Sequence, residues 1–416
     1  MISAQNRLLL LSGNRWFLFL TLALLTAACS PKVLPVANQP VKSAPKPVEN
    51  QPAKPIVVKP VAPKVSTISL LLPFGLDHLA PGANYTSVSL KEADIALGYY
   101  RGFKLALDSL TAAGYNYKLQ VYDSRDQNAQ VHSLAFNPAI KNSDLIVGPV
   151  FPDDIKAFTA AYTNGKQPIV SPLSPASPAT FKNPELITII PPLEYHAWSA
   201  ARYISNKLHP DKIFILRSGF SEENEYIGPF KRAIDSLGKR HIKVVELTVI
   251  HGQLGPIINQ LNPGGKNVFI VPATDQRFLT TTLRALDSLN KSYPVTVFGH
   301  PSWVNFTFLK AELLQRLDTH ITSSDHVDYK AENTIAFVRQ YRNVYHTEPT
   351  NYAIKGFDEG LYLGKLLAND SINGLSKADF TGLHNDFEFQ KKPGIGWINT
   401  HVNIYKYANF ELKKVE

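Results

Sequence analysis

The sequence predicts an α/β fold made of two doubly wound lobes, each with a mostly parallel sheet covered by helices on both faces. Two observations lead to this prediction. From Thr67 onward, short apolar runs with strand character alternate with amphipathic stretches of helical period, an alternation typical of parallel sheets. The alternation starts a second time near residue 193, and a single sheet would need too many strands to hold both series.

The N-terminal residues 1–28 predict export. They combine Arg7 and Arg15 with the apolar run WFLFLTLALL, which is too short for a comfortable membrane span. The LTAAC that follows places small residues directly before Cys29, the single cysteine of the chain, and resembles the lipobox of bacterial lipoproteins. This resemblance implies cleavage before Cys29 and attachment of a diacylglycerol to its sulfur. The alternative is an ordinary secretory signal with a chance cysteine.

Residues 29–65 predict a lipidated cysteine followed by an unstructured tether. Dense prolines hold the backbone near polyproline II and remove hydrogen-bond donors. The tether also carries much of the chain's formal net charge of +9. The signal accounts for two positive charges and the tether for five, which leaves +2 from Ser66 onward. Because this part is nearly neutral and has no basic stripe interleaved with aromatic residues, we expect no binding of nucleic acid.

The first series of elements begins with the buried-strand pattern ISLLLPF. A helix within ALGYYRGFKLALDSLTAAG follows, and Gly114 stands where its C-terminal cap belongs. The strands expected next are YKLQVYD, DLIVGPV, PIVSP and LITII, the last of which ends at Ile190.

The second series begins with a helix around EYHAWSAARYISNKL. It continues with strand KIFILRS, helix IGPFKRAIDSLG, strands KVVELTV and NVFIVPA, helix RFLTTTLRALDSLN and strand VTVFGHP. Two further helices are expected in NTIAFVRQYRNVYH and IKGFDEGLYLGKLLAN. The alternating Ile398, Val402, Ile404 and Tyr407 then predict strands near a sheet edge.

Taken in order, these segments resemble the type I periplasmic binding proteins, the family of the leucine/isoleucine/valine receptors of ABC transporters. The resemblance rests on ISLLLPF, YYRGFKLALDSL, VYDSRDQ, IVGPV followed by PIVSPLSP, FGHPSW and EPTNYAIKGFDEGLYL. It implies three crossovers between the lobes, with ligand bound at the carboxyl ends of the strands, as in other open α/β sheets. It places the first lobe at residues 66–190 and 324–391, and the second at 191–323 and 392–416. A second resemblance is to outer-membrane lipoprotein activators of penicillin-binding proteins, which share this fold and act through protein contacts.

The residues that hold an amino acid in this family are replaced here. A Ser or Thr four residues after the glycine of the Gly-Pro turn binds the ligand's carboxylate, and the matching residue is Pro152, followed by Asp153 and Asp154. Proline offers neither hydroxyl nor N–H, and carboxylates repel one another. The start of a helix explains the same residues without a ligand.

Two further positions depart from the family pattern. The segment Ser171-Pro-Leu-Ser174-Pro has proline where a threonine is expected, although Ser174 retains a hydroxyl. In the second lobe, the segment from Gly299 to Trp303 lacks the acid that holds the ligand's ammonium in relatives. We therefore do not expect a free amino acid as the ligand.

The candidate binding residues follow the ends of predicted strands. Trp303 would offer a stacking face to a sugar, an aromatic group or a cation, or else would seal its turn in the core. Thr274 and Asp275 would contact ligand, or would start a helix with Thr274 as its N-cap. The full set of candidate cleft residues is Phe74, Asp153, Ser171, Ser174, Ser218, Phe220, Tyr226, Thr274, Asp275, His300 and Trp303.

Enzyme motifs are missing from the sequence. There is no HExxH, no G-x-S-x-G and no calcium-binding loop, and the glycine pair in NPGGKN precedes a strand instead of opening a helix. We therefore expect no catalysis, no metal and no cofactor.

These observations predict a non-catalytic, membrane-anchored receptor whose lobes close on a small molecule, such as a peptide, a sugar or a muropeptide, for an ABC permease. The alternative is an envelope regulator that binds a peptidoglycan synthase or another protein. We expect the protein at the cell envelope, facing the periplasm. The long tether, and Ser30 in place of Asp after the cysteine, favour the outer membrane over the inner.

Overall fold

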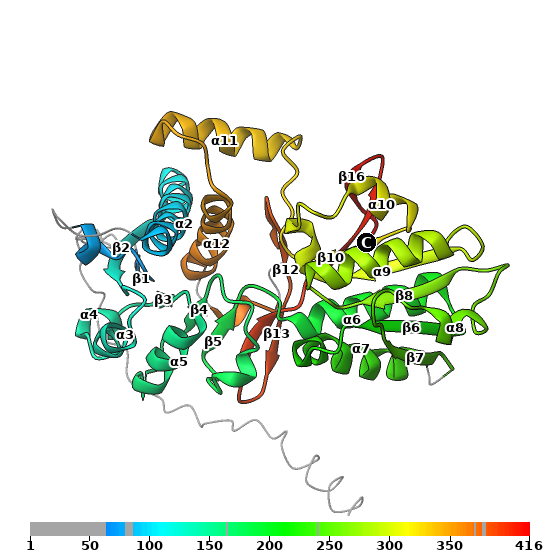
Figure 1. The fold of residues 1–416 in the computed structure, drawn as a ribbon. Helices are drawn as coiled ribbons and strands as arrows, with labels where there is room; N and C mark the ends of the chain where they lie inside the picture. Colours follow the sequence, from blue (N-terminus) through cyan, green and yellow to red (C-terminus); the bar gives the residue numbers. More distant parts are fainter. Residues whose placement is uncertain (1–63, 80–85, 164, 239–240, 370–371, 377–379) are drawn as a thin grey trace, which may run out of the picture. The chain divides into compact units, whose positions relative to one another are not determined.

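The computed structural model describes residues 64–79, 86–163, 165–238, 241–369, 372–376 and 380–416. Two seven-stranded sheets form the framework of this part, and helices lie on both faces of each (Figure 1). The predicted α/β fold class with two doubly wound lobes is confirmed. The expected signal (1–28) lies outside the described residues, as does the expected tether (29–65) except for its last two residues.

The first sheet is mostly parallel, with only its last strand antiparallel to its neighbour. In spatial order its strands are β2 (Asn116–Asp123), β1 (Val65–Leu72), β3 (Leu145–Val147), β4 (Ile169–Ser171), β5 (Leu186–Thr188), β14 (Gly396–Asn399) and β13 (Phe389–Lys392). Its helices are α2 (Ser87–Ala112), α3 (Asn128–Leu134), α4 (Pro138–Lys141), α5 (Pro152–Ala161), α11 (Glu332–Tyr345) and α12 (Asn351–Ala368).

Strand β1 shows why the inner strands read as continuous apolar runs. Ile68, Leu70 and Leu72 pack into the core cluster that contains α2 and α12. Leu71 points to the other face and packs with side chains of α3, α4 and α5. A strand covered on both faces has no solvent side, and from Ile68 to Leu72 this strand is apolar except for the buried Ser69.

The second sheet has the same plan. Its strands, in spatial order, are β7 (Lys243–Thr248), β6 (Lys212–Arg217), β8 (Asn267–Val271), β9 (Val295–Gly299), β10 (His320–Ser323), β15 (Asn403–Ala408) and β16 (Glu411–Lys414). Helices α6 (Leu193–Tyr203) and α7 (Asn224–Leu237) cover one face. Helices α8 (Gly255–Ile258), α9 (Gln276–Leu289) and α10 (Ala311–Arg316) lie on the other.

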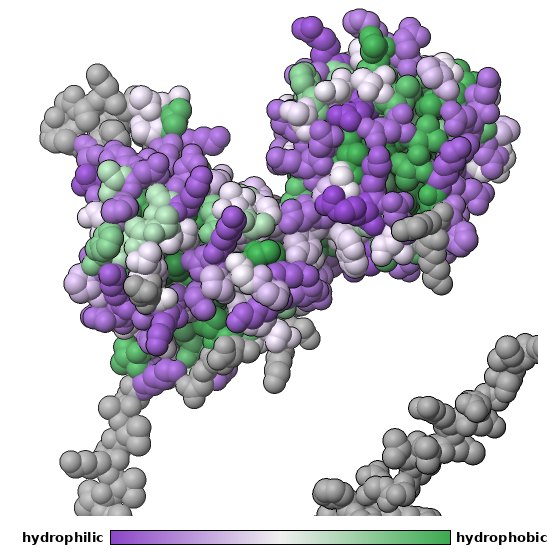
Figure 2. Space-filling model, turned by 90° about the horizontal axis from the view of Figure 1, so that it is seen from below, coloured by the Kyte–Doolittle hydropathy of each residue, from purple (hydrophilic) through white to green (hydrophobic). Residues whose placement is uncertain are grey.

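Shorter elements complete the described part. A hairpin consists of β11 (Phe380–Thr381) and β12 (Asp386–Phe387). The short helical turns are η1 (Leu76–Leu79), η2 (Pro178–Thr180), η3 (Ile204–Leu208), η4 (Ser221–Glu223), η5 (Pro301–Asn305) and η6 (Ile372–Gly374). None of the described helices is long and apolar enough to span a bilayer. On the face drawn in Figure 2, hydrophilic residues predominate and hydrophobic ones form separate patches.

The chain passes between the two sheets after β5, after β10, and between β14 and β15. The last of these passages corrects one expected boundary, because residues 392–399 were assigned to the second lobe. Strand β14 instead pairs in parallel with β5 of the first sheet, where Trp397 lies opposite Ile187. The alternation of apolar residues is the same on both sides of this passage, so the pattern did not reveal where the chain changes sheets.

Helices α2 and α12 touch backbone to backbone. A Cβ atom added to Gly102 would lie 1.8 Å from the carbonyl oxygen of Ala353, and one added to Gly356 would lie 2.2 Å from that of Tyr99. Glycine is therefore required at both positions by the closeness of the two helices. The two helices cover one face of the first sheet, and their side chains form a large part of the core cluster on that face.

We predict that Gly356→Ala lowers the free energy of unfolding by about 1–3 kcal/mol, the usual cost of overpacking a core. Gly255→Ala is the matched control, because an added Cβ there meets nothing within 4 Å. The control should change stability by less than about 0.5 kcal/mol. Chemical denaturation of both variants measures the difference, and equal effects would contradict the close contact of α2 with α12.

Candidate functional site

One cavity on the second lobe is lined by five of the predicted cleft residues. Its volume is about 390 Å³, and its walls are Leu193, Phe220, Glu222, Glu223, Tyr226, Pro272, Thr274, Asp275 and His300. These side chains come mainly from the segments that follow β6, β8 and β9. Since these strands are parallel, their carboxyl ends meet at one edge of the sheet, where ligands of such folds bind.

The aromatic wall of this cavity contains one exposed and one buried ring. Phe220 is 60% exposed, whereas Tyr226 is 1% exposed and lies against His300, with 6.3 Å between ring centroids. Burial raises the pKa of Tyr226, and its hydroxyl has no hydrogen-bond partner among the described residues. A buried hydroxyl without a partner is costly, so it marks a position where a ligand atom would be stabilising.

The imidazole ring of His300 is neutral and offers one N–H donor to the cavity. Burial lowers its pKa to about 4, so the ring carries no charge near neutral pH. Its Nδ1 accepts a hydrogen bond from the backbone N–H of Ser302 at 3.1 Å. The proton of the neutral ring therefore lies on Nε2.

The β6–α7 turn is held by Glu223. Its carboxylate accepts hydrogen bonds from the Ser218 backbone N–H at 3.0 Å, the Ser218 hydroxyl at 2.7 Å and the Gly219 N–H at 3.3 Å. The Arg217 guanidinium lies 3.7 Å away. Ser218, a predicted ligand contact, is thus engaged within the turn and does not line the cavity.

Two predictions about the second lobe need correction. The N-cap of α9 is Asp275, which accepts from the N–H of Phe278 at 2.7 Å; Thr274 was the expected cap, but the helix starts one residue later. Trp303 offers no stacking face to a ligand, because it is 1% exposed and its Nε1–H donates to the carbonyl of Ala273 at 2.9 Å. The alternative given above, a core tryptophan that seals the turn, describes it correctly.

The predicted residues of the first lobe do not line this cavity. Phe74 packs edge-on against Tyr100, with ring centroids 6.1 Å apart. Ser171 and Ser174 are buried, and Ser174 accepts from the N–H of Ala176. Asp153 is exposed in the first turn of α5. These side chains lie near the carboxyl ends of β1, β3 and β4, the corresponding edge of the first sheet.

The start of α5 matches the helix-start interpretation, with Pro152 at the first helical position and two acids in the first turn. Sequence reasoning missed the environment of Asp154, which is 2% exposed and has one carboxylate oxygen without a partner among the described residues. Burial, followed by the charges of Asp126 and Asp153, raises its pKa to about 7. Asp126 belongs to the loop after β2, and nothing in the spacing of the sequence signals that it lies near α5.

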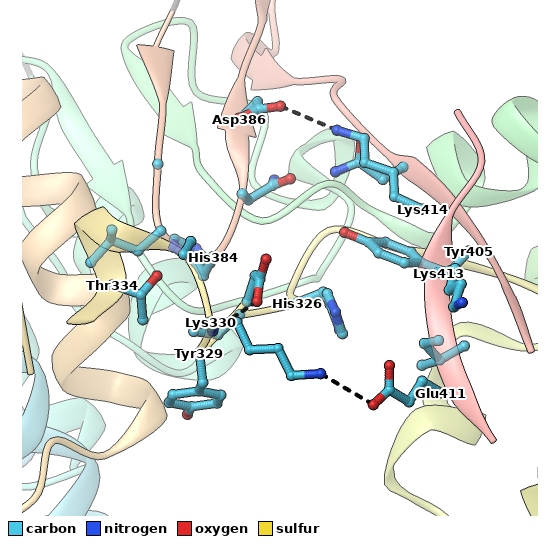
Figure 3. A pocket seen from close by; sticks show the side chains of 18 of the residues that line it. His326, Tyr329, Lys330, Thr334, His384, Asp386, Tyr405, Glu411, Lys413 and Lys414 are labelled. Carbon is cyan, nitrogen blue, oxygen red and sulfur yellow. Dashed lines mark hydrogen bonds and ion pairs between the residues drawn. The ribbon is translucent and has the colours of Figure 1, made fainter. Parts of the chain in front are cut away.

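A larger cavity, of about 880 Å³, was also missed (Figure 3). It is lined by residues of three segments, 326–334, 381–386 and 403–414. In Figure 3, Lys330 reaches toward Glu411 at 3.3 Å, and Asp386 lies 3.6 Å from Lys414. The Nδ1 atom of His384 is hydrogen-bonded to a carboxylate oxygen of Asp358 at 2.5 Å. The three segments share no motif, so only the fold brings them together.

Among the described residues, no group of three or more His, Cys, Asp and Glu side chains is arranged to hold a metal ion.

We predict that Asp154→Asn raises the melting temperature more at pH 8 than at pH 5. The unfolded carboxyl ionises near its ordinary pKa of 3.8 and the folded one near 7, so the folded state binds the proton more tightly. Stability is then lost as the pH rises from about 4 to 7, a loss that asparagine cannot show. Asp235→Asn, at an exposed position of α7, is the control and should give the same shift at both pH values. A gain for Asp154→Asn that is equal at pH 5 and pH 8 would contradict the raised pKa.

No protein-family model matches this sequence, and no curated protein matches it. Solved structures do share its fold. A putative branched-chain amino acid ABC transporter protein from Rhodospirillum rubrum is 13% identical, with a TM-score of 0.63, over 85% of this chain and 100% of that one. A substrate-binding protein from Desulfitobacterium hafniense, solved in complex with Leu, is 17% identical, with a TM-score of 0.55 and the same coverage.

A third similar structure has a different role. It is the C-domain of LpoA from Haemophilus influenzae, described as a regulator of PBP1A, which is 13% identical with a TM-score of 0.57. The match covers 84% of this chain and 100% of that one. At these identities the likeness establishes the fold and not the role. The chain has the two-lobed fold of the type I periplasmic binding proteins, which transport receptors and a cell-wall regulator share.

Proposed function

We propose that this protein is a non-catalytic receptor that binds a small molecule at the carboxyl ends of its strands. The observation that carries the proposal is the cavity on the second lobe, where side chains from three separate loops enclose about 390 Å³. This volume lies within the usual range of small-molecule sites. In open α/β sheets, ligands bind at this edge.

Two side chains in the wall of the cavity favour the presence of a ligand. Phe220 is 60% exposed, and the hydroxyl of the buried Tyr226 has no hydrogen-bond partner among the described residues. An exposed aromatic ring beside an unsatisfied polar atom is stabilised when a ligand covers both. The fixed turn at Glu223 holds these side chains in place before ligand arrives.

Closure of the two lobes would complete the site. We infer that Phe74, Asp153, Ser171 and Ser174, at the corresponding edge of the first sheet, form the second wall. A ligand that touches both walls favours the closed arrangement by the difference in its contacts between the two states. A free amino acid held in the usual way is not part of the proposal, because Pro152 stands where its carboxylate would be bound.

A regulator of a cell-wall enzyme is the second candidate, and one surface favours it. Trp198 on α6 is 42% exposed, and the Arg202 guanidinium lies over its ring, 5.2 Å from the centroid. Both line a cavity of about 650 Å³ together with Arg232 and Lys392. Exposed Trp and Arg are the residues that contribute most to protein interfaces.

Anchoring at the cell envelope through Cys29 is part of the same proposal. The two acyl chains of a diacylglycerol hold a protein stably, since each buried methylene contributes about 0.8 kcal/mol. Cys29→Ala should abolish the incorporation of labelled palmitate into the protein in cells, because it removes the sulfur that carries the lipid. The measurement is labelling followed by isolation of the protein, and equal labelling of the variant and the unchanged protein would contradict lipid anchoring at Cys29.

We predict that a panel of amino acids, peptides, sugars, muropeptides and amines contains a solute that raises the melting temperature of the full chain. A ligand present at 100 times its dissociation constant adds about 2.7 kcal/mol of stability. Phe220→Ala should abolish this effect because it removes the exposed wall of the cavity. Phe136→Ala, at a ring 52% exposed on the first lobe, is the matched control and should leave it intact. The receptor proposal fails if no solute in the panel shifts the transition.

A further inference from the structure

The ligand-side edges of both sheets are acidic, although the chain as a whole is basic. The formal net charge is +9, and the part from Ser66 onward carries +2. At the carboxyl ends of β1, β2, β3, β6 and β8 stand eight carboxylates and two arginines. The carboxylates belong to Asp77, Asp123, Asp126, Asp153, Asp154, Glu222, Glu223 and Asp275, and the guanidinium groups to Arg125 and Arg217. This local excess of negative charge selects for ligands of the opposite sign, because a concave site focuses its field.

The cavity on the second lobe contains three acids and no lysine or arginine among its lining residues. Glu223 is engaged in its turn and is balanced by Arg217 at 3.7 Å. The carboxylate of Glu222 makes no hydrogen bond or ion pair within the described part of the chain, and Asp275 gives one oxygen to the cap of α9. Since His300 is neutral, two uncompensated negative charges remain at the wall of the cavity.

The aromatic side chains of the cavity add to this preference. The exposed face of Phe220 is free to take a cation, and cations are attracted to the faces of aromatic rings within about 6 Å. The unpartnered hydroxyl oxygen of Tyr226 accepts a hydrogen bond from an ammonium or guanidinium group as readily as from a neutral donor. Aromatic faces combined with carboxylates are the chemistry that recognises organic cations.

The corresponding edge of the first lobe is also acidic. Asp126 and Asp153 raise the pKa of Asp154 through their charges, after the larger effect of burial. Arg125, on the same loop as Asp126, lies 3.8 Å from Asp77. Asp154 is 2% exposed and has a carboxylate oxygen without a partner in the described residues. A bound cation would relieve this repulsion, whereas a carboxylate would add to it.

We propose that the ligand of this receptor is a small organic cation that carries an amine, guanidinium or quaternary ammonium group and no carboxylate. The proposal rests on the receptor function proposed above and specifies its ligand class. An amino acid brings a carboxylate into an acidic site and is disfavoured, and a neutral sugar gains nothing from the charge.

The experiment is isothermal titration calorimetry of the full chain at low ionic strength with two matched pairs of probes. Agmatine and arginine differ by one carboxylate, and choline and 3,3-dimethyl-1-butanol differ by one positive charge. We expect at least one cation, agmatine or choline, to bind at least about tenfold more tightly than its partner, a difference worth about 1.4 kcal/mol. Raising the salt concentration should weaken this binding, because it screens the charges.

Two charge-removing variants locate the effect. Asp275→Asn keeps an N-cap residue of the same quality and removes only the charge. Glu222→Gln likewise removes one charge, and each variant should weaken cation binding by about tenfold, which corresponds to about 1.4 kcal/mol. Asp235→Asn, an exposed position of α7 outside the cavity, should leave the affinity unchanged.

Failure of this inference and failure of the receptor function give different results. Equal binding within both pairs, tighter binding of arginine or the alcohol, or full affinity in both variants would overturn the cation proposal. If a sugar, peptide or amino acid binds while agmatine and choline do not, the inference is overturned and the receptor function stands. If no solute of any class binds, both are overturned.

Discussion

The parallel pairing of strands within each sheet is the constraint on which the rest of the structure depends. Parallel neighbours need long crossover connections, most of which contain a helix here, so both faces become covered and the inner strands are mostly apolar. The same pairing brings every loop that follows a strand to one edge. Phe220 and His300 are eighty positions apart in the chain and yet line a single cavity, because β6, β8 and β9 run side by side in the same direction. The close contact of α2 with α12 through Gly102 and Gly356 holds one of these helical layers in place.

Much of this architecture follows from local patterns. Alternating apolar runs and amphipathic stretches are properties of short segments, so the two series of strands and helices were predicted, together with the residues that follow the strand ends. Five of those residues share a cavity. What failed depended on contacts between distant segments. Strand β14 belongs to the first sheet because it pairs with β5. Trp303 is buried and donates a hydrogen bond to the carbonyl of Ala273. The spacing of residues in the sequence indicates neither contact.

Charge is distributed in the same non-local way. The positive charge of the chain is concentrated before Ser66, whereas the acids near the strand ends come from loops far apart in the sequence. No single segment is acidic enough to attract notice. Only the fold shows that Asp126 lies close enough to act on Asp154.

The central claim is that the loops at the carboxyl ends of the strands bind a small molecule. Hydrogen exchange of the full chain, with and without the solute of the panel that raises its melting temperature most, measures this binding, since each loop reports its own protection. We expect slower exchange in residues 218–226, 272–276 and 300–306, and in residues 148–154 of the first lobe. Unchanged exchange in all of these loops, or protection confined to other segments, would contradict it.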